Sequence, residues 1–221
     1  MNGTVYLLDI DGTLVDSNYH HVVAWRRAFQ RHELNVPAWR IHKVMGMGGD
    51  QLIAELAGDQ VEREHGDSIR EAWQQEFEPN LQYIEPFDGA HRLLADIVAA
   101  GGTVVLASSS KPHHAKHYVD LLDARDLATA WTDSGDVSDT KPSPELLHEG
   151  LSRVDGKRAV VIGDAVWDGV AARRAGLPFV GVLGGGYTDA ELREAGAGQV
   201  YDGTEALRND LADLPTAPIN S

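Results

Sequence analysis

The sequence of 221 residues contains no cysteine, so neither disulfide bonds nor thiolate metal sites contribute to this protein. It has no apolar run near the ~20 residues that a membrane-spanning helix needs, and no basic and apolar secretory signal at its N-terminus. Basic residues are few: 19 Lys and Arg stand against 34 Asp and Glu, which gives a formal net charge of −15. This surplus opposes non-specific binding to nucleic acid or anionic membranes. We expect a cytoplasmic protein with neither as a partner.

Short apolar stretches rich in Val, Leu and Ile predict six β-strands, at residues 4–9, 103–107, 129–132, 159–163, 179–183 and 198–201. Segments with helical spacing of apolar residues lie between most of them, at 88–100, 143–152, 165–175 and 188–195. Buried strands that alternate with helices are typical of a mainly parallel sheet with helices on both faces. The predicted fold class is therefore α/β, with a doubly wound, Rossmann-like core.

One interval interrupts this alternation. Residues 17–83 contain no convincing strand, but they show helical periodicity at 19–32, 50–58 and 60–78. The interval is too long for a crossover and predicts an inserted helical cap subdomain, bordered by turn-forming residues that suit hinges. We therefore expect a core domain of residues 1–16 and 84–221 and a cap domain of residues 17–83. The last residues, 214–221, are expected to be frayed.

The first predicted strand ends in two aspartates, Asp9 and Asp11. Residues two apart on an extended chain project to the same side, so both carboxylates can face one reactant. Gly12 allows the backbone to turn directly afterwards. Short aspartate side chains also serve as turn and helix-capping groups, so this pair alone leaves a structural role open.

Three later strand ends also carry polar residues, at the edge where open parallel sheets bind ligands. Residues 108–111 offer hydroxyls and backbone N–H groups for an anion, although serines also cap helices, and both roles can hold for different serines. Lys141 is held extended by the following Pro142, and on its own it would be read as a surface charge. Asp164 ends the fourth strand, and Asp168 begins the next helix, where the helix dipole favours an anion. Either aspartate could be a helix cap.

Together and in this order, these segments resemble the signature of the haloacid dehalogenase superfamily. Its strongest element is an apolar strand followed by DxDGTLVDS, which residues 9–17 match. The resemblance covers the whole chain, includes the helical insertion after the first motif, and points to the branch of phosphoglycolate phosphatase and β-phosphoglucomutase.

The resemblance implies a role for each matching residue. Asp9 would be the nucleophile that forms an aspartyl-phosphate, and Asp11 the general acid and base. Ser108 would bind the phosphoryl group and Lys141 would offset its charge. Mg²⁺ would be held by Asp9, the backbone carbonyl of Asp11, Asp164 and, directly or through water, Asp168; these oxygen ligands suit Mg²⁺ better than Zn²⁺. Substrate contacts are expected from Gly12, Thr13, His21, Ser109 and Lys111.

Four aspartates so close together raise the pKa of one of them, and we expect that one to be Asp11. Protonated Asp11, Mg²⁺ and Lys141 would bring the formal charge to about zero, so that a phosphate monoester can enter.

The carboxylate of Asp11 favours phosphoryl transfer, because dehalogenases of this superfamily lack one at that position. His21 and Lys111 are similar to residues of the β-phosphoglucomutase branch that serve a sugar phosphate. That branch carries an arginine in the cap loop for a second phosphate, whereas residues 45–50 here have glycine. We therefore expect a Mg²⁺-dependent phosphatase of small phosphate monoesters; a sugar phosphomutase and a non-catalytic binding protein remain the alternatives.

Three further features have two interpretations each. His21 either contacts substrate or is only a helix residue at the hinge. Gly46, Gly48 and Gly49 either turn the chain before a helix capped by Asp50, which we favour, or form a substrate-specificity loop. Three histidines are compatible with a metal cluster, but a solvated helix is the favoured interpretation; they are His113, His114 and His117.

Overall fold

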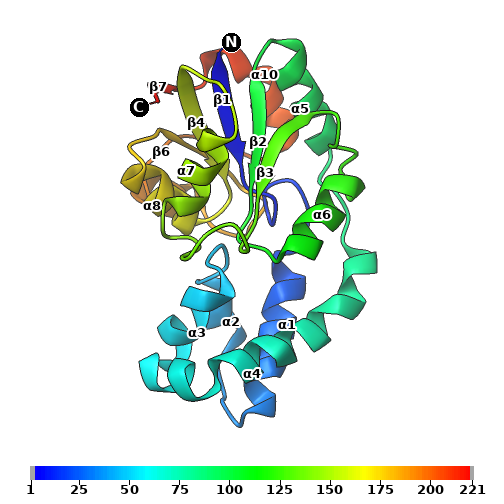
Figure 1. The fold of residues 1–221 in the computed structure, drawn as a ribbon, viewed down its shortest axis with the longest axis vertical. Helices are drawn as coiled ribbons and strands as arrows, with labels where there is room; N and C mark the ends of the chain where they lie inside the picture. The colour runs from blue at the N-terminus through cyan, green and yellow to red at the C-terminus, as the bar shows by residue number, and fades with distance from the viewer. Residues whose placement is uncertain (1–2, 220–221) are drawn as a thin grey trace.

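The structure, a computed structural model, describes residues 3–219 and has a sheet part and a helical part (Figure 1). Six parallel strands lie in the order β3-β2-β1-β4-β5-β6. Their bounds are β1 Thr4–Leu8, β2 Thr103–Ala107, β3 Ala128–Thr132, β4 Arg158–Gly163, β5 Phe179–Val182 and β6 Ala197–Tyr201. Each bound lies within one residue of its prediction, and the predicted fold class is confirmed.

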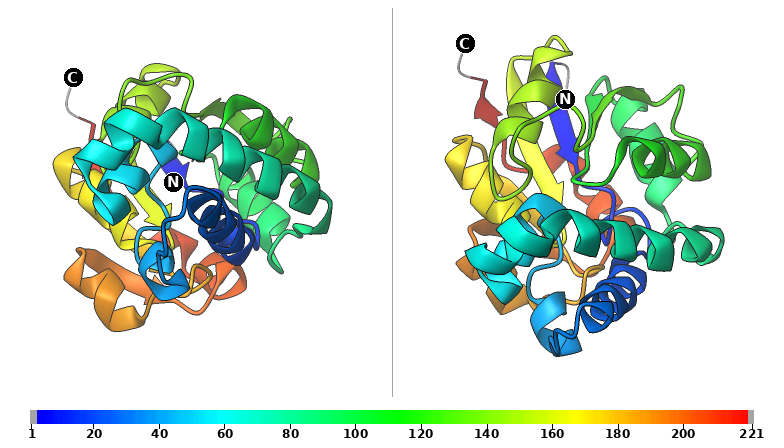
Figure 2. Two further views of the ribbon diagram at one scale, coloured as in Figure 1. Left: turned by 90° about the horizontal axis from the view of Figure 1, so that it is seen from below. Right: turned by 60° about the horizontal axis from the view of Figure 1, so that its bottom comes forward.

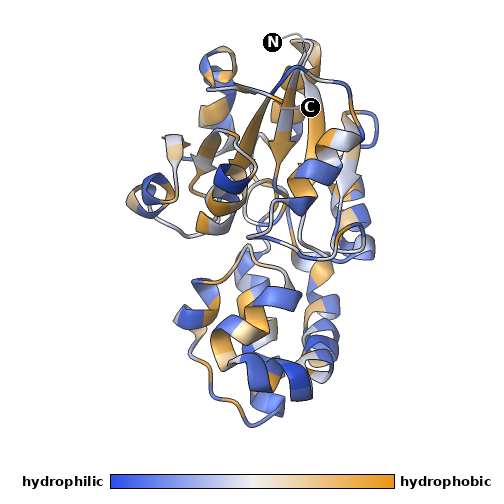
Figure 3. Ribbon diagram, turned by 60° about the vertical axis from the view of Figure 1, so that its left-hand side comes forward, coloured by the Kyte–Doolittle hydropathy of each residue, from blue (hydrophilic) through white to orange (hydrophobic). Residues whose placement is uncertain are grey.

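Alternate residues of each strand face opposite sides of the sheet, because successive side chains of a strand point in opposite directions. Tyr6 and Leu8 of β1 join one buried cluster, together with residues of α5, α6 and α10. Val5 and Leu7 join a second cluster, together with residues of α7, α8 and α9. Figure 3 shows the apolar strands between helices with polar outer faces. These helices are α5 Ala90–Ala99, α6 Pro112–Leu121, α7 Glu145–Ser152, α8 Val166–Arg174, α9 Asp189–Glu194 and α10 Thr204–Asn209, followed by η2 Leu211–Asp213.

The helical part lies beyond the carboxyl ends of the strands (Figures 1 and 2). It consists of α1 Asn18–Arg31, α2 Ala38–His42, α3 Gly49–Ala57, α4 Asp59–Phe77 and the 3-10 helix η1 Glu78–Tyr83. Three of these match the predicted helices to within one residue, whereas the short α2 was not predicted. Buried aromatic side chains of α1 and α4 pack against each other, and the two tryptophan rings, Trp25 and Trp73, stack with centroids 5.1 Å apart. Within residues 3–219, no helix is both long and apolar enough to cross a membrane.

The two connections between the parts run side by side. The N–H of Asp16 donates to the carbonyl of Glu85, and the N–H of Phe87 donates to the carbonyl of Leu14, both at 2.9 Å. These bonds join the chain that enters the helical part to the chain that leaves it. The two covalent connections between the parts thus lie at one place.

The C-terminal segment is more ordered than expected. Strand β7, Ala217–Pro218, pairs antiparallel with the first residues of β4. The N–H of Ile219 also donates to the carbonyl of Lys157 at 3.1 Å. The prediction of a frayed end is therefore wrong for residues 214–219, while 220–221 lie outside the described residues. The physical reason is that β5 pairs with β4 only from Val161 onward, which leaves the start of β4 open to a further strand.

Candidate active site

A buried ion pair lies at the carboxyl ends of β1 and β4, and the loop between β3 and α7 supplies its lysine. The Nζ of Lys141 lies 2.6 Å from Oδ1 of Asp9 and 2.8 Å from Oδ1 of Asp168. Lys141 is only 1% exposed, although a lone lysine is usually a surface charge. Burial alone would lower the pKa of Lys141, but the two carboxylates outweigh burial and raise it. Lys141 is therefore a fixed positive charge between two acids.

Three buried carboxylates share this single ammonium group. One oxygen from each of Asp9, Asp164 and Asp168 lies within 4.8 Å of the others. Burial raises the pKa of Asp9 to about 7, even though Lys141 acts in the opposite direction. Burial and the charge of Asp168 also raise the pKa of Asp164. The group thus carries a surplus of negative charge and offers only oxygen donors, which suits a hard dication such as Mg²⁺.

Asp164 is held in place by short polar contacts. The hydroxyl of Thr13 donates to its Oδ1 at 2.7 Å, and the amide of Asn18 donates to its Oδ2 at 3.0 Å. A Cβ on Gly12, whose φ is +77°, would lie 2.4 Å from this carboxylate, and a Cβ on Gly185 would lie 1.7 Å from it. Gly12 and Thr13 thus lie against Asp164, and their contact with substrate stays a prediction.

Asp11 lies in a different environment from Asp9. Its Oδ1 is 2.5 Å from the hydroxyl of Ser17 and 3.0 Å from Nε2 of His21, and its Oδ2 accepts from Ser110 at 2.6 Å. Burial alone would raise the pKa of Asp11, but these bonds, that of His21 foremost, hold it well below its usual range. The expectation that Asp11 carries the raised pKa is therefore corrected: the raised values belong to Asp9 and Asp164.

His21 connects Asp11 to the aromatic side chains of the helical part. Its ring stacks on Phe77 with centroids 3.9 Å apart and on Trp73 at 5.6 Å. His21 is buried and also lines the cavity described below, so both interpretations of it, as a hinge residue and as a substrate contact, are compatible with its place.

The segment after β2 presents different serines in different ways. Ser108 is fully buried, and its Oγ accepts from the N–H of Ser110 at 3.0 Å. The Oγ of Ser109 has no hydrogen-bond partner among the described residues. Lys111 donates to Oε1 of Gln74 at 2.6 Å and lies 5.7 Å above the ring of Trp73. Ser109 and Lys111 line the cavity, with Ser108 behind them.

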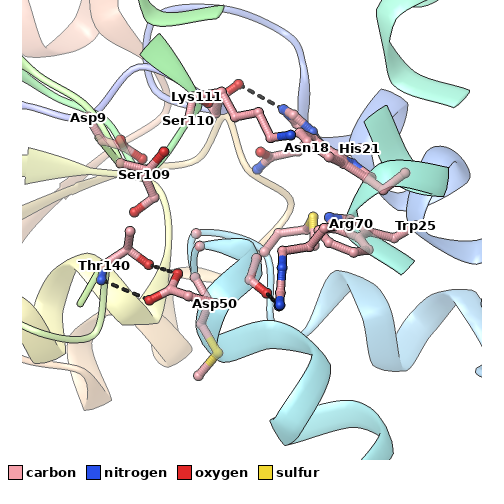
Figure 4. Close-up of a pocket in the computed structure, with 18 of the residues that line it drawn as sticks. Asp9, Asn18, His21, Trp25, Asp50, Arg70, Ser109, Ser110, Lys111 and Thr140 are labelled. Carbon is pink, nitrogen blue, oxygen red and sulfur yellow. Dashed lines mark hydrogen bonds and ion pairs between the residues drawn. The ribbon is translucent and has the colours of Figure 1, made fainter. Parts of the chain in front are cut away.

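A cavity of about 260 Å³ lies between the sheet part and the helical part (Figure 4). The sheet part contributes Asp9, Asp11 and residues 109–111 to its wall. The helical part contributes the apolar side chains of two tryptophans and two methionines together with four polar side chains, namely Trp25, Trp73, Met45, Met47, Asn18, His21, Asp50 and Arg70. Because Arg70 donates to both Glu62 and Asp67, its charge is already balanced. The cavity thus has an acidic floor at the strand ends and a roof whose apolar part is formed by the tryptophans and methionines.

Polar contacts close the helical part over this cavity. Asp50 accepts hydrogen bonds from the N–H of Thr140, at 3.1 Å, and from its hydroxyl (Figure 4). His42 lies 2.9 Å from the carbonyl of Gly185 on another side. The expectation that Asp50 caps a helix is wrong: α3 begins at Gly49, so Asp50 lies inside its first turn and reaches across to Thr140 instead. Asp50 therefore touches the residue next to Lys141.

Sequence reasoning missed several residues of this site. Ser17 and Asn18 directly follow the first motif, so their position next to the acids was a usable signal. Ser110 lies in the serine run, but the sequence does not show which serine meets Asp11. Arg70 and Asp50 resemble ordinary charged helix residues, and only the three-dimensional arrangement brings them to the cavity.

Comparisons with known proteins agree with this geometry. A family model described as haloacid dehalogenase-like hydrolase matches residues 6–182. Validoxylamine A 7'-phosphate phosphatase from Streptomyces hygroscopicus subsp. limoneus is 27% identical over 180 residues, which cover 80% of this chain and 84% of the relative. Phosphoglycolate phosphatase from Caulobacter vibrioides is 26% identical and covers 99% of this chain and 92% of its own. A hydrolase from Pseudomonas syringae superposes with a TM-score of 0.89 and 31% identity, covering 97% of this chain and 99% of its own.

Proposed function

Because the chain belongs to the haloacid dehalogenase-like hydrolase family, we propose that it is a Mg²⁺-dependent phosphatase of small phosphate monoesters that reacts through an aspartyl-phosphate. The observation that carries the proposal is the buried group of Asp9, Lys141, Asp164 and Asp168, of which Asp9 reaches the wall of the cavity between the two parts. That the enzyme is a phosphatase is also supported by the names of its relatives. The expected cytoplasmic location stays a prediction.

Asp9 is the proposed nucleophile. Its ion pair with Lys141 fixes one carboxylate oxygen, and its place on the cavity wall lets the other approach a bound phosphoryl group. The Asp9 oxygen forms a bond to phosphorus as the bond from phosphorus to the ester oxygen breaks. Water then attacks phosphorus, releases inorganic phosphate and restores the Asp9 carboxylate.

Asp11 is the proposed proton carrier. It gives a proton to the leaving ester oxygen in the first step and takes one from the attacking water in the second. In the described conformation its bonds with His21, Ser17 and Ser110 favour the ionised form. A phosphate dianion placed beside Asp11 would raise its pKa, since like charges disfavour ionisation. Loading with substrate thus supports the protonated form that the first step needs.

Mg²⁺ fits the three carboxylates because they carry three formal negative charges against the single charge of Lys141. We expect Asp9, the backbone carbonyl of Asp11 and Asp164 to hold the ion, with Asp168 as a direct or water-mediated ligand. When bound, it supplies positive charge that stabilises the charge on the transferring group. Thr13 and Asn18, which bind both oxygens of Asp164, would keep that ligand oriented.

The proposed phosphate-binding groups follow β2. Ser109, whose hydroxyl has no hydrogen-bond partner within residues 3–219, and Lys111 both line the cavity. Ser108 is the phosphoryl-binding residue that the resemblance implies. It directly precedes Ser109 in the chain and is fully buried, with its hydroxyl bonded to the N–H of Ser110. The organic part of the substrate would contact the apolar roof formed by Trp25, Trp73 and the two methionines.

A β-phosphoglucomutase-like reaction is the second candidate, because His21 and Lys111 both line the cavity. A mutase must also hold a second phosphate at the cap. Among the described residues, Arg70 is the lysine or arginine that the helical part places on the cavity wall. Its charge is already balanced by Glu62 and Asp67. Gly49 of the cap loop lies next to Arg70 and adds no positive charge that could bind a second phosphate. These contacts favour the phosphatase.

The test is phosphate release from a panel of metabolite monoesters, with Mg²⁺ and with a chelator. We expect release that requires Mg²⁺ and disappears in Asp9→Asn, while Asp155→Asn, the same change at an exposed site, keeps wild-type turnover. Asp11→Asn with p-nitrophenyl phosphate should release about one nitrophenolate per enzyme and then stop, because this leaving group needs no proton whereas hydrolysis of the intermediate needs a base. Undiminished turnover by Asp9→Asn would refute the assignment.

The same panel decides between the alternatives. A hexose 1-phosphate converted to its 6-phosphate isomer without free phosphate would establish the mutase. Ligand binding without phosphate release from any ester would indicate a binding protein.

A further inference from the structure

A second group of possible metal ligands lies outside the cavity, where the helical part meets α6. Glu78, the first residue of η1, faces His113 and His114 in the first turn of α6. Its Oε1 lies 2.6 Å from Nε2 of His113 and 3.2 Å from Nε2 of His114. One donor atom from each residue lies within 4.8 Å of the other two. The sequence favoured a solvated helix here, but His114 has an exposed fraction of 0%.

The chemistry of this group differs from that of the aspartates. Two imidazole nitrogens and one carboxylate oxygen are typical ligands of zinc and neighbouring divalent transition metals, whereas Mg²⁺ prefers oxygen ligands alone. A tetrahedral ion with bonds of about 2.0–2.1 Å keeps its ligand atoms roughly 3.3 Å apart. The distance from Glu78 to His114 already has this value, and the distance from Glu78 to His113 needs to grow by less than about 1 Å.

The surroundings fix two of the three ligands. The ring of His114 packs in T-shaped contacts on Phe77 and Trp73, with its Nε2 toward Glu78. The amide of Gln74 donates to Oε1 of Glu78 at 3.1 Å and orients the carboxylate. Hydrogen bonds of this kind orient metal-binding carboxylates in known sites.

The third ligand gives access from solvent. The side chain of His113 is 48% exposed and that of Glu78 is 37% exposed. An ion can therefore reach the group without unfolding of the protein, and water can fill a fourth position.

We propose that Glu78, His113 and His114 form a binding site for a zinc-type divalent ion, separate from the Mg²⁺ group at Asp9, Asp164 and Asp168. The bound ion joins the helical part, through η1, to α6 of the sheet part.

If the chain is the proposed phosphatase, zinc bound at this site should affect its turnover. Gln74 bonds both to Glu78 and to Lys111, a residue of the cavity wall. An ion on Glu78 would tie the end of α4 to α6 and oppose any separation of the two parts during turnover. Zinc should therefore slow the Mg²⁺-loaded enzyme, and Glu78→Gln should relieve this inhibition.

Zinc binding itself is tested by competition of the untagged, full-length protein with a chromophoric chelator, in excess Mg²⁺. We expect one zinc ion per chain with wild-type protein, and at least about tenfold weaker binding with Glu78→Gln and with His113→Ala. His117→Ala, on the same helix but outside the group, should bind as wild type does. Asp164→Asn should also retain zinc, because it changes only the aspartate group. Circular dichroism confirms that each variant is folded; His114 is left unchanged because it is buried.

Equal zinc affinity in wild type, Glu78→Gln and His113→Ala would overturn the proposal, as would loss of zinc in Asp164→Asn with retention in His113→Ala. Since binding is measured without substrate, a chain that binds zinc but releases no phosphate would refute the proposed function and leave the metal site standing.

Discussion

The negative charge around Asp9 predicts that removing it stabilises the metal-free protein. Asp9, Asp164 and Asp168 are all at least nine-tenths buried, and Lys141 is the cation that contacts Asp9 and Asp168. Asparagine has nearly the shape of aspartate and resembles its neutral form. Asp9→Asn should therefore relieve the repulsion without creating a cavity, and it should become more stable as it loses the proposed nucleophile.

The pKa of Asp9 gives the magnitude. Burial raises it from 3.8 to about 7. A tenfold change in proton affinity corresponds to about 1.4 kcal/mol, so ionised Asp9 destabilises the folded state by up to about 4 kcal/mol above pH 7. We expect Asp9→Asn to recover about 2–4 kcal/mol of unfolding free energy at pH 7.5 in chelator.

The sign of the pH dependence follows from the same pKa. Between pH 4 and 7 the folded protein keeps a proton on Asp9 that the unfolded chain has already lost. The folded state thus binds more protons in this window, and the stability of metal-free wild type should fall as the pH rises through it. Asp9→Asn should lack this part of the slope.

Urea denaturation at several pH values between 5 and 8, with chelator and with saturating Mg²⁺, measures both effects. In Mg²⁺ the order should reverse, because the ion stabilises wild type more than a variant that has lost a ligand. Asp155→Asn, at an exposed position, should stay within about 0.5 kcal/mol of wild type throughout. If metal-free Asp9→Asn is less stable than wild type at pH 7.5, the reasoning about surplus charge is wrong.

Three further predictions test neighbouring contacts. Lys141→Met should abolish turnover. In chelator it should also lower the unfolding free energy, measured by urea denaturation, by about 3–5 kcal/mol, because Asp9 and Asp168 lose the cation between them. A decrease below about 1 kcal/mol would contradict this. Gly185→Ala places a Cβ 1.7 Å from Asp164 and should weaken Mg²⁺ binding in calorimetry by about tenfold or more, whereas Gly203→Ala, with open space around it, should not. Asp50→Asn should raise KM by about tenfold with little change in Tm, because its contact with Thr140 closes the cavity, whereas exposed Glu55→Gln should leave KM unchanged.

The sheet was predictable from the sequence because its inner strands are buried on both faces. Strands such as β1, with five consecutive buried residues, form continuous apolar runs, and local composition alone marks them. Strand β7 has only two residues, one of them proline, so its pairing depends on the open edge of β4 rather than on its own sequence.

The acids at the strand ends were predictable for a related reason. Asp9 and Asp164 each follow a predicted parallel strand, and the carboxyl ends of parallel strands lie at the same edge of a sheet, so the two acids were expected to meet there. Contacts between the two parts were not predictable in this way. Asp50 meets Thr140 across 90 residues, and periodicity within a helix does not fix how that helix lies against a distant loop.

The position of Asp11 changes how the charge of the site is balanced. The sequence suggested that a proton on Asp11, together with Mg²⁺ and Lys141, would neutralise four aspartates. With Asp11 held ionised by His21 and the two serines, the four carboxylates, Mg²⁺ and Lys141 sum to −1. Lys111 is the remaining positive side chain on the cavity wall whose charge no carboxylate contacts among the described residues, and it offsets this surplus of the four carboxylates. In a chain with a net charge of −15, Lys111 thus allows an anionic substrate to enter before Asp11 acquires its proton.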